Sequence, residues 1–293
     1  MKSEIPGGEW PLALSTGLLT DVPLHDVLDA VKRAGFSSIE IAASISHFDY
    51  HDSNAVSQVR KKLEGLGMKV NSFHAPYKDA DLTLLEEGER RKAVGEVLTA
   101  AEALSALGGR FLVLHGGSEE QAVPGEEMGA RLEQAGKSLL EIHERCGQLG
   151  LTVAVEDMLG HLVGGKLEQV MWLVARLPEK GTGICLDTGH SFLTGKLMER
   201  ASAFGPRLLM AHIHDNNGVY DDHLPPGDGK LPWYALFQTF AEHRFRGPLV
   251  LELTGQGATP ARLETAARGA AFIRQLTYYR ATTTVPPADN GGH

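Results

Sequence analysis

Short apolar runs alternate along this chain with longer segments of helical periodicity. The apolar runs are continuous rather than alternating, as expected for strands that are buried on both faces of a parallel sheet. Strands are predicted at 12–18, 38–42, 70–74, 111–115, 151–156, 183–187, 207–214 and 248–253. Helices are predicted at 24–34, 53–66, 84–107, 128–149, 167–177, 195–204, 232–243 and 261–279. The fold class is therefore α/β.

Eight strand–helix units with short links favour one particular α/β architecture. Regular alternation of strands and helices specifies a parallel sheet, and eight repeats favour closure into a (β/α)8 TIM barrel. A doubly wound open sheet is the alternative. Neither an internal repeat nor an interdomain linker is evident, so residues 1–280 are predicted to form a single barrel domain. The polar, proline-bearing segment 281–293 is predicted to be a disordered tail.

Bulk properties narrow the classes of function and compartment. The chain has 293 residues and a formal net charge of −9, and it lacks a run rich in lysine or arginine. The broad basic footprint of a nucleic-acid-binding protein is thus missing, although bound divalent cations would offset part of the negative field. Cys146 and Cys185 suit buried thiols in a reducing compartment. The N-terminus does not resemble a signal peptide and no run reaches transmembrane length, so a soluble cytoplasmic protein is expected.

The predicted strands end on residue types that bind metals. These ends are His74, His115, Glu156, Asp187 and Glu252, and the run 208–215 adds His212, His214 and Asp215. In a barrel of parallel strands, all carboxyl ends meet on one face, where that fold carries its active sites. Six strand ends of this kind predict a richly coordinated or polynuclear metal site.

The segment Asp187-Thr188-Gly189-His190 carries the strongest signal. We expect Gly189 to form a tight turn that brings His190 back over the barrel mouth. Asp187 would then hold one metal, and His190 a second metal or a substrate oxygen. The structural alternative is that Asp187 caps a helix and His190 is solvated.

The segment 212–229 supplies a second group of candidates. His212 and His214 lie two apart on a strand and therefore point to the same side. Asp221 and His223 follow on a loop that is stiffened by two prolines and two glycines. Of the two strand histidines, His212 is the preferred ligand, and for His214 ligand and structural roles remain open.

Two carboxylates suggest the chemistry. Glu156 and Glu252 could each take or give a proton on either side of a small substrate, as isomerisation or epimerisation next to a carbonyl requires, with a metal stabilising the enediolate. Helix capping or a salt bridge is the structural alternative for both.

Tyr77 could pack over the pocket or lie on the surface. Three cations could meet a phosphate, although ordinary solvated charge is favoured for each of them: Lys196, Arg207 and Lys230.

These motifs resemble the xylose isomerase-like superfamily of TIM barrels, which includes sugar phosphate isomerases/epimerases, ketose 3-epimerases, inosose dehydratases and apurinic endonuclease IV. The resemblance extends from the first strand to Glu252. It implies that a single-metal sugar enzyme would use Glu156, Asp187, His212 and Glu252 as ligands. It also implies that the endonuclease branch would add ligands for two more zinc ions, at His74, His115, His190, Asp221 and His223.

Two departures separate the chain from particular branches. Ketose 3-epimerases carry a glutamate and an arginine where this chain has Leu162 and Gly218. The endonuclease uses arginine-bearing loops to penetrate DNA, whereas the segment 42–50 here contains no arginine and the segment 215–223 is acidic. This comparison favours the sugar enzymes.

The leading expectation is a divalent-metal-dependent isomerase or epimerase of a sugar or sugar-like polyol, with or without a phosphate. Glu156, Glu252 and His190 would be its catalytic residues, and the cofactor would be one to three ions of manganese or zinc. The alternative is a trinuclear-zinc phosphodiesterase of the endonuclease IV type acting on abasic DNA. A non-catalytic barrel that binds a metal or sugar is a third reading. The expected partner is a small sugar, with nucleic acid disfavoured, no membrane, and a homo-oligomer as an open option.

Overall fold

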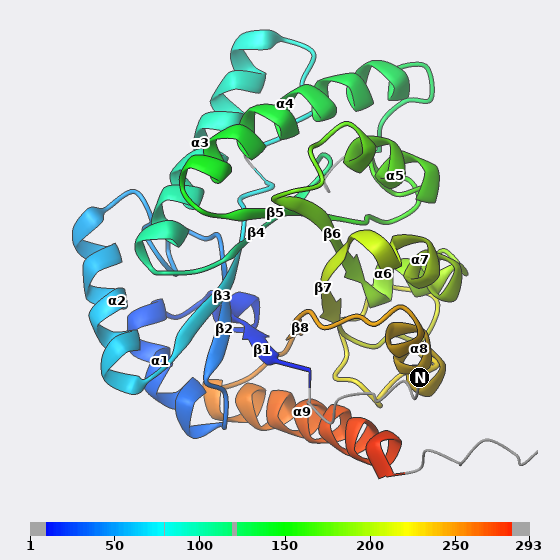
Figure 1. The fold of residues 1–293 in the computed structure, drawn as a ribbon. Coiled ribbons are helices and arrows are strands. Elements are labelled where there is room, and N and C mark those ends of the chain that lie inside the picture. Colours follow the sequence, from blue (N-terminus) through cyan, green and yellow to red (C-terminus); the bar gives the residue numbers. More distant parts are fainter. Residues whose placement is uncertain (1–9, 79, 119–121, 283–293) are drawn as a thin grey trace, which may run out of the picture.

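The computed structural model describes residues 10–78, 80–118 and 122–282, and these form a closed barrel of eight parallel strands (Figure 1). Each strand pairs with the next in sequence, and β8 closes the barrel onto β1. The strands are β1 Leu12–Ser15, β2 Ser38–Ala42, β3 Lys69–His74, β4 Phe111–His115, β5 Thr152–Glu156, β6 Thr182–Asp187, β7 Leu208–Ile213 and β8 Leu249–Leu251. The predicted (β/α)8 barrel is confirmed, and the open-sheet alternative is wrong.

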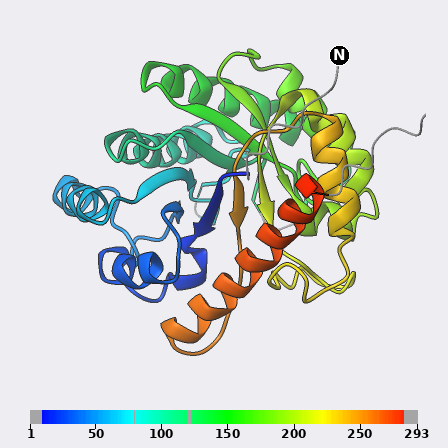
Figure 2. The same ribbon diagram turned by 60° about the horizontal axis from the view of Figure 1, so that its bottom comes forward.

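Helices surround the barrel and supply the outer half of its core. They are α1 Leu24–Arg33, α2 Ser53–Leu66, α3 Glu87–Ala106, α4 Met128–Gln148, α5 Leu167–Ala175, α6 Thr188–Leu193, α7 Leu197–Phe204, α8 Trp233–Glu242 and α9 Thr259–Thr282. Short 3-10 helices occupy Thr16–Leu19 and Gly205–Arg207. The long helix α9 runs along the outside of the barrel beside β8 (Figure 2).

Predicted and observed elements differ where local hydrogen bonding overrides periodicity. The segment expected as one helix at 195–204 belongs to a pair, α6 and α7. Asp187 caps α6 by accepting a hydrogen bond from the His190 amide at 2.7 Å. The expected tight turn at Gly189 is therefore wrong, because Gly189 lies inside α6. Helix α9 continues to Thr282, two residues into the expected tail, and the rest of that tail (283–293) lies outside the described residues.

The barrel interior is filled below the strand ends by a small apolar layer. Its members are Ala13, Phe111, Val113, Ala154, Cys185, Met210 and Val250. Side chains alternate between the two faces of each strand. The next inward-facing residue on each of these strands, two positions further along, therefore lies at the carboxyl-terminal rim. Packing this layer with apolar residues leaves the rim as the place where polar side chains can gather. Within the described residues, no helix is long and apolar enough to cross a membrane.

Candidate metal centre

Glu156 is the hub of the polar cluster at the rim. It is the last residue of β5 and its side chain is 1% exposed. Its Oε2 lies 3.3 Å from Nε2 of His74 and 3.4 Å from Nε2 of His115, which end the two preceding strands. Its Oε1 lies 3.1 Å from Nδ1 of His212. One carboxylate thus faces three imidazoles.

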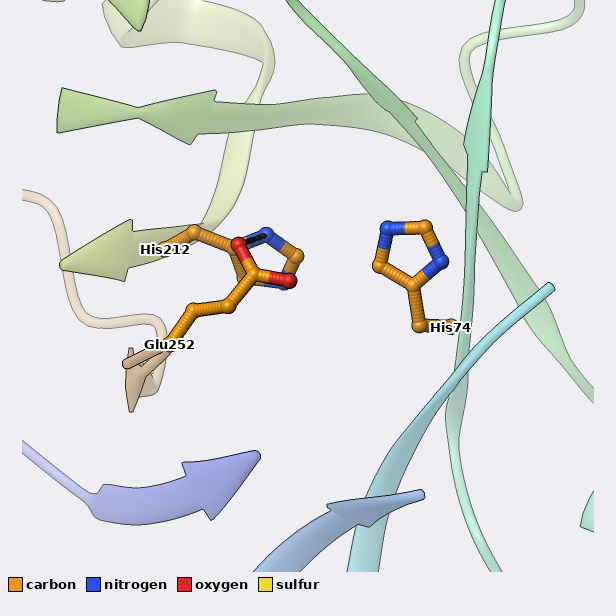
Figure 3. Close-up of side chains that lie close together, drawn as sticks. All are labelled: His74, His212 and Glu252. Carbon is orange, nitrogen blue, oxygen red and sulfur yellow. Dashed lines mark ion pairs between the residues drawn. The ribbon is translucent and has the colours of Figure 1, made fainter. Parts of the chain in front are cut away.

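His212 joins this hub to two further acids. Its Nδ1 lies 3.1 Å from Glu252 Oε2 as well as from Glu156, and its Nε2 lies 3.1 Å from Oε2 of Glu40, in the middle of β2. Figure 3 shows His212 and Glu252 side by side, with the ring of His74 facing them from β3. Because Glu40 is fully buried and also accepts a hydrogen bond from Ser72 at 2.7 Å, it fixes the ring with Nδ1 towards the other carboxylates.

A second cluster lies beside the first and centres on Asp221. Oδ2 of this residue is 3.1 Å from Nε2 of His190 and 3.0 Å from Nε2 of His223. His190 is 5% exposed, so the alternative in which it is solvated is wrong. Eight of the nine predicted ligands belong to overlapping groups whose ligand atoms lie within 4.8 Å of one another. The ninth, Asp187, lies beside them, with its Oδ1 3.6 Å from Nδ1 of His190.

His214, which the sequence left open, belongs to the same region. Its Nε2 lies 3.0 Å from both carboxylate oxygens of Asp187, and its ring stacks on that of His223 with centroids 3.9 Å apart. A side chain at position 189 would collide with this ring, since a Cβ there would lie 2.0 Å from Cε1 of His214. Gly189 is thus required for close approach and not for a turn.

Three of the candidate histidines are oriented in the way that metal-binding histidines are. In each, Nδ1 donates a hydrogen bond to a backbone carbonyl and Nε2 faces the cluster, an arrangement that fixes the ring and the tautomer. The pairs are His74 to Ala75 (3.0 Å), His190 to Asp157 (2.9 Å) and His223 to Glu252 (2.9 Å).

Several buried polar atoms of the clusters lack a hydrogen-bond partner among the described residues. They are Oε2 of Glu156, which has only the two imidazole contacts at 3.3 and 3.4 Å, and Oδ1 of Asp221 and Nδ1 of His214, which lie 3.9 Å apart. Buried polar atoms are nearly always hydrogen-bonded in native proteins, so these atoms are available to a metal ion. Imidazole nitrogens and carboxylate oxygens in this proportion suit zinc, manganese, iron or cobalt. The residues therefore fit a centre of one or more divalent ions.

The electrostatics of the cluster are those of imidazoles and carboxylates that compensate one another. Burial alone would raise the pKa of Glu156, but His212, His115 and His74 hold it well below its usual range. Burial alone would lower the pKa of His74, yet Glu156 raises it to about 10. Burial would likewise lower the pKa of His223, but the neighbouring Asp221 raises it to about 9. A metal cation would replace these protons as the compensating positive charge.

A cavity of about 670 Å³ opens above the clusters. Seven of the nine predicted ligands line it, namely His74, His115, Glu156, His190, Asp221, His223 and Glu252. Asp187 and His212 are fully buried beneath these residues. Tyr77 also lines the cavity, and its ring centroid is 5.0 Å from that of His115. The volume is that of a small-molecule site, which spans about 300–1,000 Å³.

Supporting residues were the part of the site that sequence reasoning missed. Asp157 accepts hydrogen bonds from the Asp187 amide at 2.7 Å and Ser191 at 2.6 Å, and it pairs with the buried Arg200 at 2.6 Å. It thereby ties the end of β5 to the start of α6. The dipeptide Glu156-Asp157 was a visible signal, but nothing local in the sequence pairs Asp157 with a residue 43 positions away.

Asp215 organises the loop that carries Asp221 and His223. Its carboxylate accepts hydrogen bonds from the amides of Asn216, Gly227 and Leu231 and from the indole of Trp233. His223 itself has a φ of 46°, which is unfavourable for a residue with a side chain. The many bonds to the buried Asp215 offset that strain and hold the loop in place.

Comparisons with known proteins concern the family and the fold of the whole chain. A family model described as "Xylose isomerase-like TIM barrel" matches residues 28–276. An uncharacterised protein of Sinorhizobium fredii is 28% identical over 257 residues, covering 79% of this chain and 81% of the relative. Fructoselysine 3-epimerase of Escherichia coli O157:H7 is 20% identical over 264 residues, covering 85% and 94%. A probable endonuclease 4 of Cenarchaeum symbiosum is 35% identical over 147 residues, covering 48% and 49%.

Solved structures show the same fold. A D-tagatose 3-epimerase-like protein matches with a TM-score of 0.82 at 19% identity, covering 94% of this chain and all of that chain. At this identity the likeness concerns the fold alone.

Replacement of Glu40 by glutamine is expected to weaken metal binding. Glu40→Gln removes the buried charge behind His212 without changing the size of the side chain, and losses of such outer partners typically lower metal affinity about 10- to 100-fold. Competition with a chromogenic chelator measures the affinity. Glu141→Gln, on the outer face of α4 against Arg90, is the matched control and should bind metal as the unaltered protein does. Equal affinities for both variants would contradict the role of Glu40.

Stabilisation by zinc is expected to grow with pH. The raised pKa values of His74 and His223, about 10 and about 9, mean that their ion pairs stabilise the metal-free protein fully below the ordinary histidine pKa. This contribution is lost as pH rises towards those values, whereas metal binding needs neutral imidazoles. Added Zn²⁺ should therefore raise the Tm more at about pH 8.5 than at about pH 6. A Tm gain that is independent of pH, or one matched by Ca²⁺, would contradict the assignment.

Proposed function

The chain belongs to the xylose isomerase-like TIM barrel family, and on that premise we propose that it is a divalent-metal-dependent isomerase or epimerase of a sugar or sugar-like polyol. One observation carries this proposal. The carboxylates of Glu156 and Glu252 lie 3.1 Å from the same nitrogen of His212 and both line a cavity of small-molecule size. The fructoselysine 3-epimerase among the relatives supports the same class of reaction.

Two carboxylates at one point of a cavity suit proton transfer next to a carbonyl. One carboxylate removes the proton from the carbon beside the carbonyl, and the other returns a proton at the opposite face or at the neighbouring carbon. A divalent ion held by Glu156, Asp187, His212 and Glu252 would supply electrostatic stabilisation of the enediolate. The chain would fix its substrate through His190, which lines the cavity and whose Nδ1 is held by the carbonyl of Asp157.

The charge around the cavity favours a neutral sugar over a nucleic acid. Among the described residues that line the cavity, Lys78 is the one lysine or arginine, whereas Glu156, Asp221 and Glu252 are acids. Binding of a duplex normally depends on many lysine and arginine contacts to phosphates. The formal net charge of −9 points the same way.

A second candidate function rests on the cluster around Asp221. His190, Asp221 and His223 form a complete ligand set of their own, in addition to the sets that include Glu156. A single-metal sugar enzyme does not need it. This surplus favours a trinuclear-zinc phosphodiesterase of the endonuclease IV type acting on abasic DNA, and the relative described as probable endonuclease 4 supports that alternative.

Metal content discriminates the two functions. Elemental analysis of protein purified without added metal or chelator should find about one manganese, cobalt or similar ion per chain if the sugar enzyme is correct. About three zinc ions per chain, together with cleavage of an abasic duplex at low enzyme concentration, would favour the phosphodiesterase.

Glu252→Gln is expected to abolish turnover while the fold is retained. The amide cannot exchange the proton, and loss of a general acid–base group typically costs about 10²- to 10⁴-fold. Turnover would be assayed as solvent-hydrogen exchange into ketoses and aldoses under saturating metal, with circular dichroism and metal content measured in parallel. Glu264→Gln, exposed on α9, is the matched control. A fully active Glu252→Gln protein would contradict the role of Glu252 in proton transfer.

A further inference from the structure

The cavity has two chemically different halves. The candidate ligands that line the cavity form its polar half and lie at or just beyond the ends of β3 to β8, namely His74, His115, Glu156, His190, Asp221, His223 and Glu252. Beyond the strand ends, the loops that follow β2, β3 and β5 contribute an apolar wall beside the polar Ser44, Ser46 and Lys78. The wall consists of Ile45, Pro76, Tyr77, Leu159 and Leu162. Because the strands are arranged in sequence order around the barrel, the loops after β2 and β3 lie across the mouth from those after β6 and β7.

Building on the proposed function, we propose that the substrate is a sugar joined to an apolar group, and that this group packs against the apolar wall while the sugar meets the polar half. A free monosaccharide is polar on every side. It would cover the ligand-bearing half and leave the apolar wall facing water. A conjugate with an apolar or aromatic group would bury both halves.

Exposure along the apolar wall supports this division. Ile45 is 50% exposed and so offers apolar surface to a ligand in the cavity, while Leu162 is 2% exposed and is buried beneath the wall. The hydroxyls next to Ile45 are engaged in part, since Oγ of Ser44 and Oγ of Ser46 are hydrogen-bonded to each other at 3.1 Å. Covering such apolar surface contributes about 25 cal/mol per Å². Contact of Ile45 with an apolar group would therefore contribute more binding free energy than its contact with a hydroxyl.

The same wall gives little reason to expect a phosphate. None of the three cations that could meet a phosphate is among the described residues that line the cavity, namely Lys196, Arg207 and Lys230. The guanidinium of Arg207 instead donates to the carbonyls of Val174 and Thr182, at the opposite end of the barrel from the rim. Among the described residues that line the mouth, Lys78 is the one lysine or arginine, and three acids accompany it.

Paired ligands test the proposal by binding alone. Methyl and phenyl glycosides of glucose, galactose, mannose, xylose and fructose would be titrated into the metal-loaded protein and followed by ligand-observed NMR. In at least one pair the phenyl member should bind about tenfold more tightly, the gain expected for burying one ring. Ile45→Ser and Leu159→Ser should each reduce that advantage. Tyr234→Ser, an exposed apolar position on α8 away from the cavity, should leave it unchanged.

The opposite outcomes are equally specific. Equal binding of every methyl and phenyl pair, or no binding of any phenyl member, would overturn the proposal. Tighter binding of glucose 6-phosphate than of any phenyl glycoside would also overturn it in favour of an anionic substituent. Because these readouts do not involve turnover, they remain separate from the proposed function, which fails if solvent-hydrogen exchange is absent or if Glu252→Gln stays active.

Discussion

The burial of carboxylates at the centre of the barrel is the constraint on which the site depends. Glu40, Glu156 and Asp187 are nearly or fully inaccessible to water, and an isolated charge in such a place would be strongly destabilising. The protein meets this requirement with imidazoles, because each of these acids lies within about 3.5 Å of at least one ring nitrogen. Histidine is suited to the task, since it compensates the acids as a cation when protonated and can bind a metal when neutral.

The next layer of residues converts that compensation into a fixed geometry. Asp157 with Arg200 joins two strand ends, and Asp215 holds a loop that would otherwise be free to move. Backbone carbonyls hold three histidine rings by Nδ1. Such support determines how accurately ligands are aimed. The rim is therefore a preorganised site and not a loose collection of polar side chains.

The sequence predicted the barrel and the membership of the cluster because both depend on local pattern. A strand that ends in Glu156 or Asp187 delivers that residue to the rim whatever its neighbours are. Contacts between distant strands carry no such local signal, so the pairing of His212 with Glu40, 172 positions away, was not predicted. The turn expected at Gly189 was wrong for a related reason. Sequence alone could not reveal that His214 packs against that glycine.

The sharing of one carboxylate by two groups of ligands has a thermodynamic consequence. Glu156 faces His74 and His115 with one oxygen and His212 with the other. An ion on one side of Glu156 would draw electron density from the carboxylate and fix its orientation, and both effects would change how the carboxylate binds an ion on the other side. The first ion would also displace protons from the histidines, and these protons would otherwise repel the second ion. Two ions bound on either side of Glu156 would consequently be coupled, and each would change the affinity of the other by the same factor. Occupancy of the rim by more than one ion would then be a cooperative property of the barrel rather than a sum of separate sites.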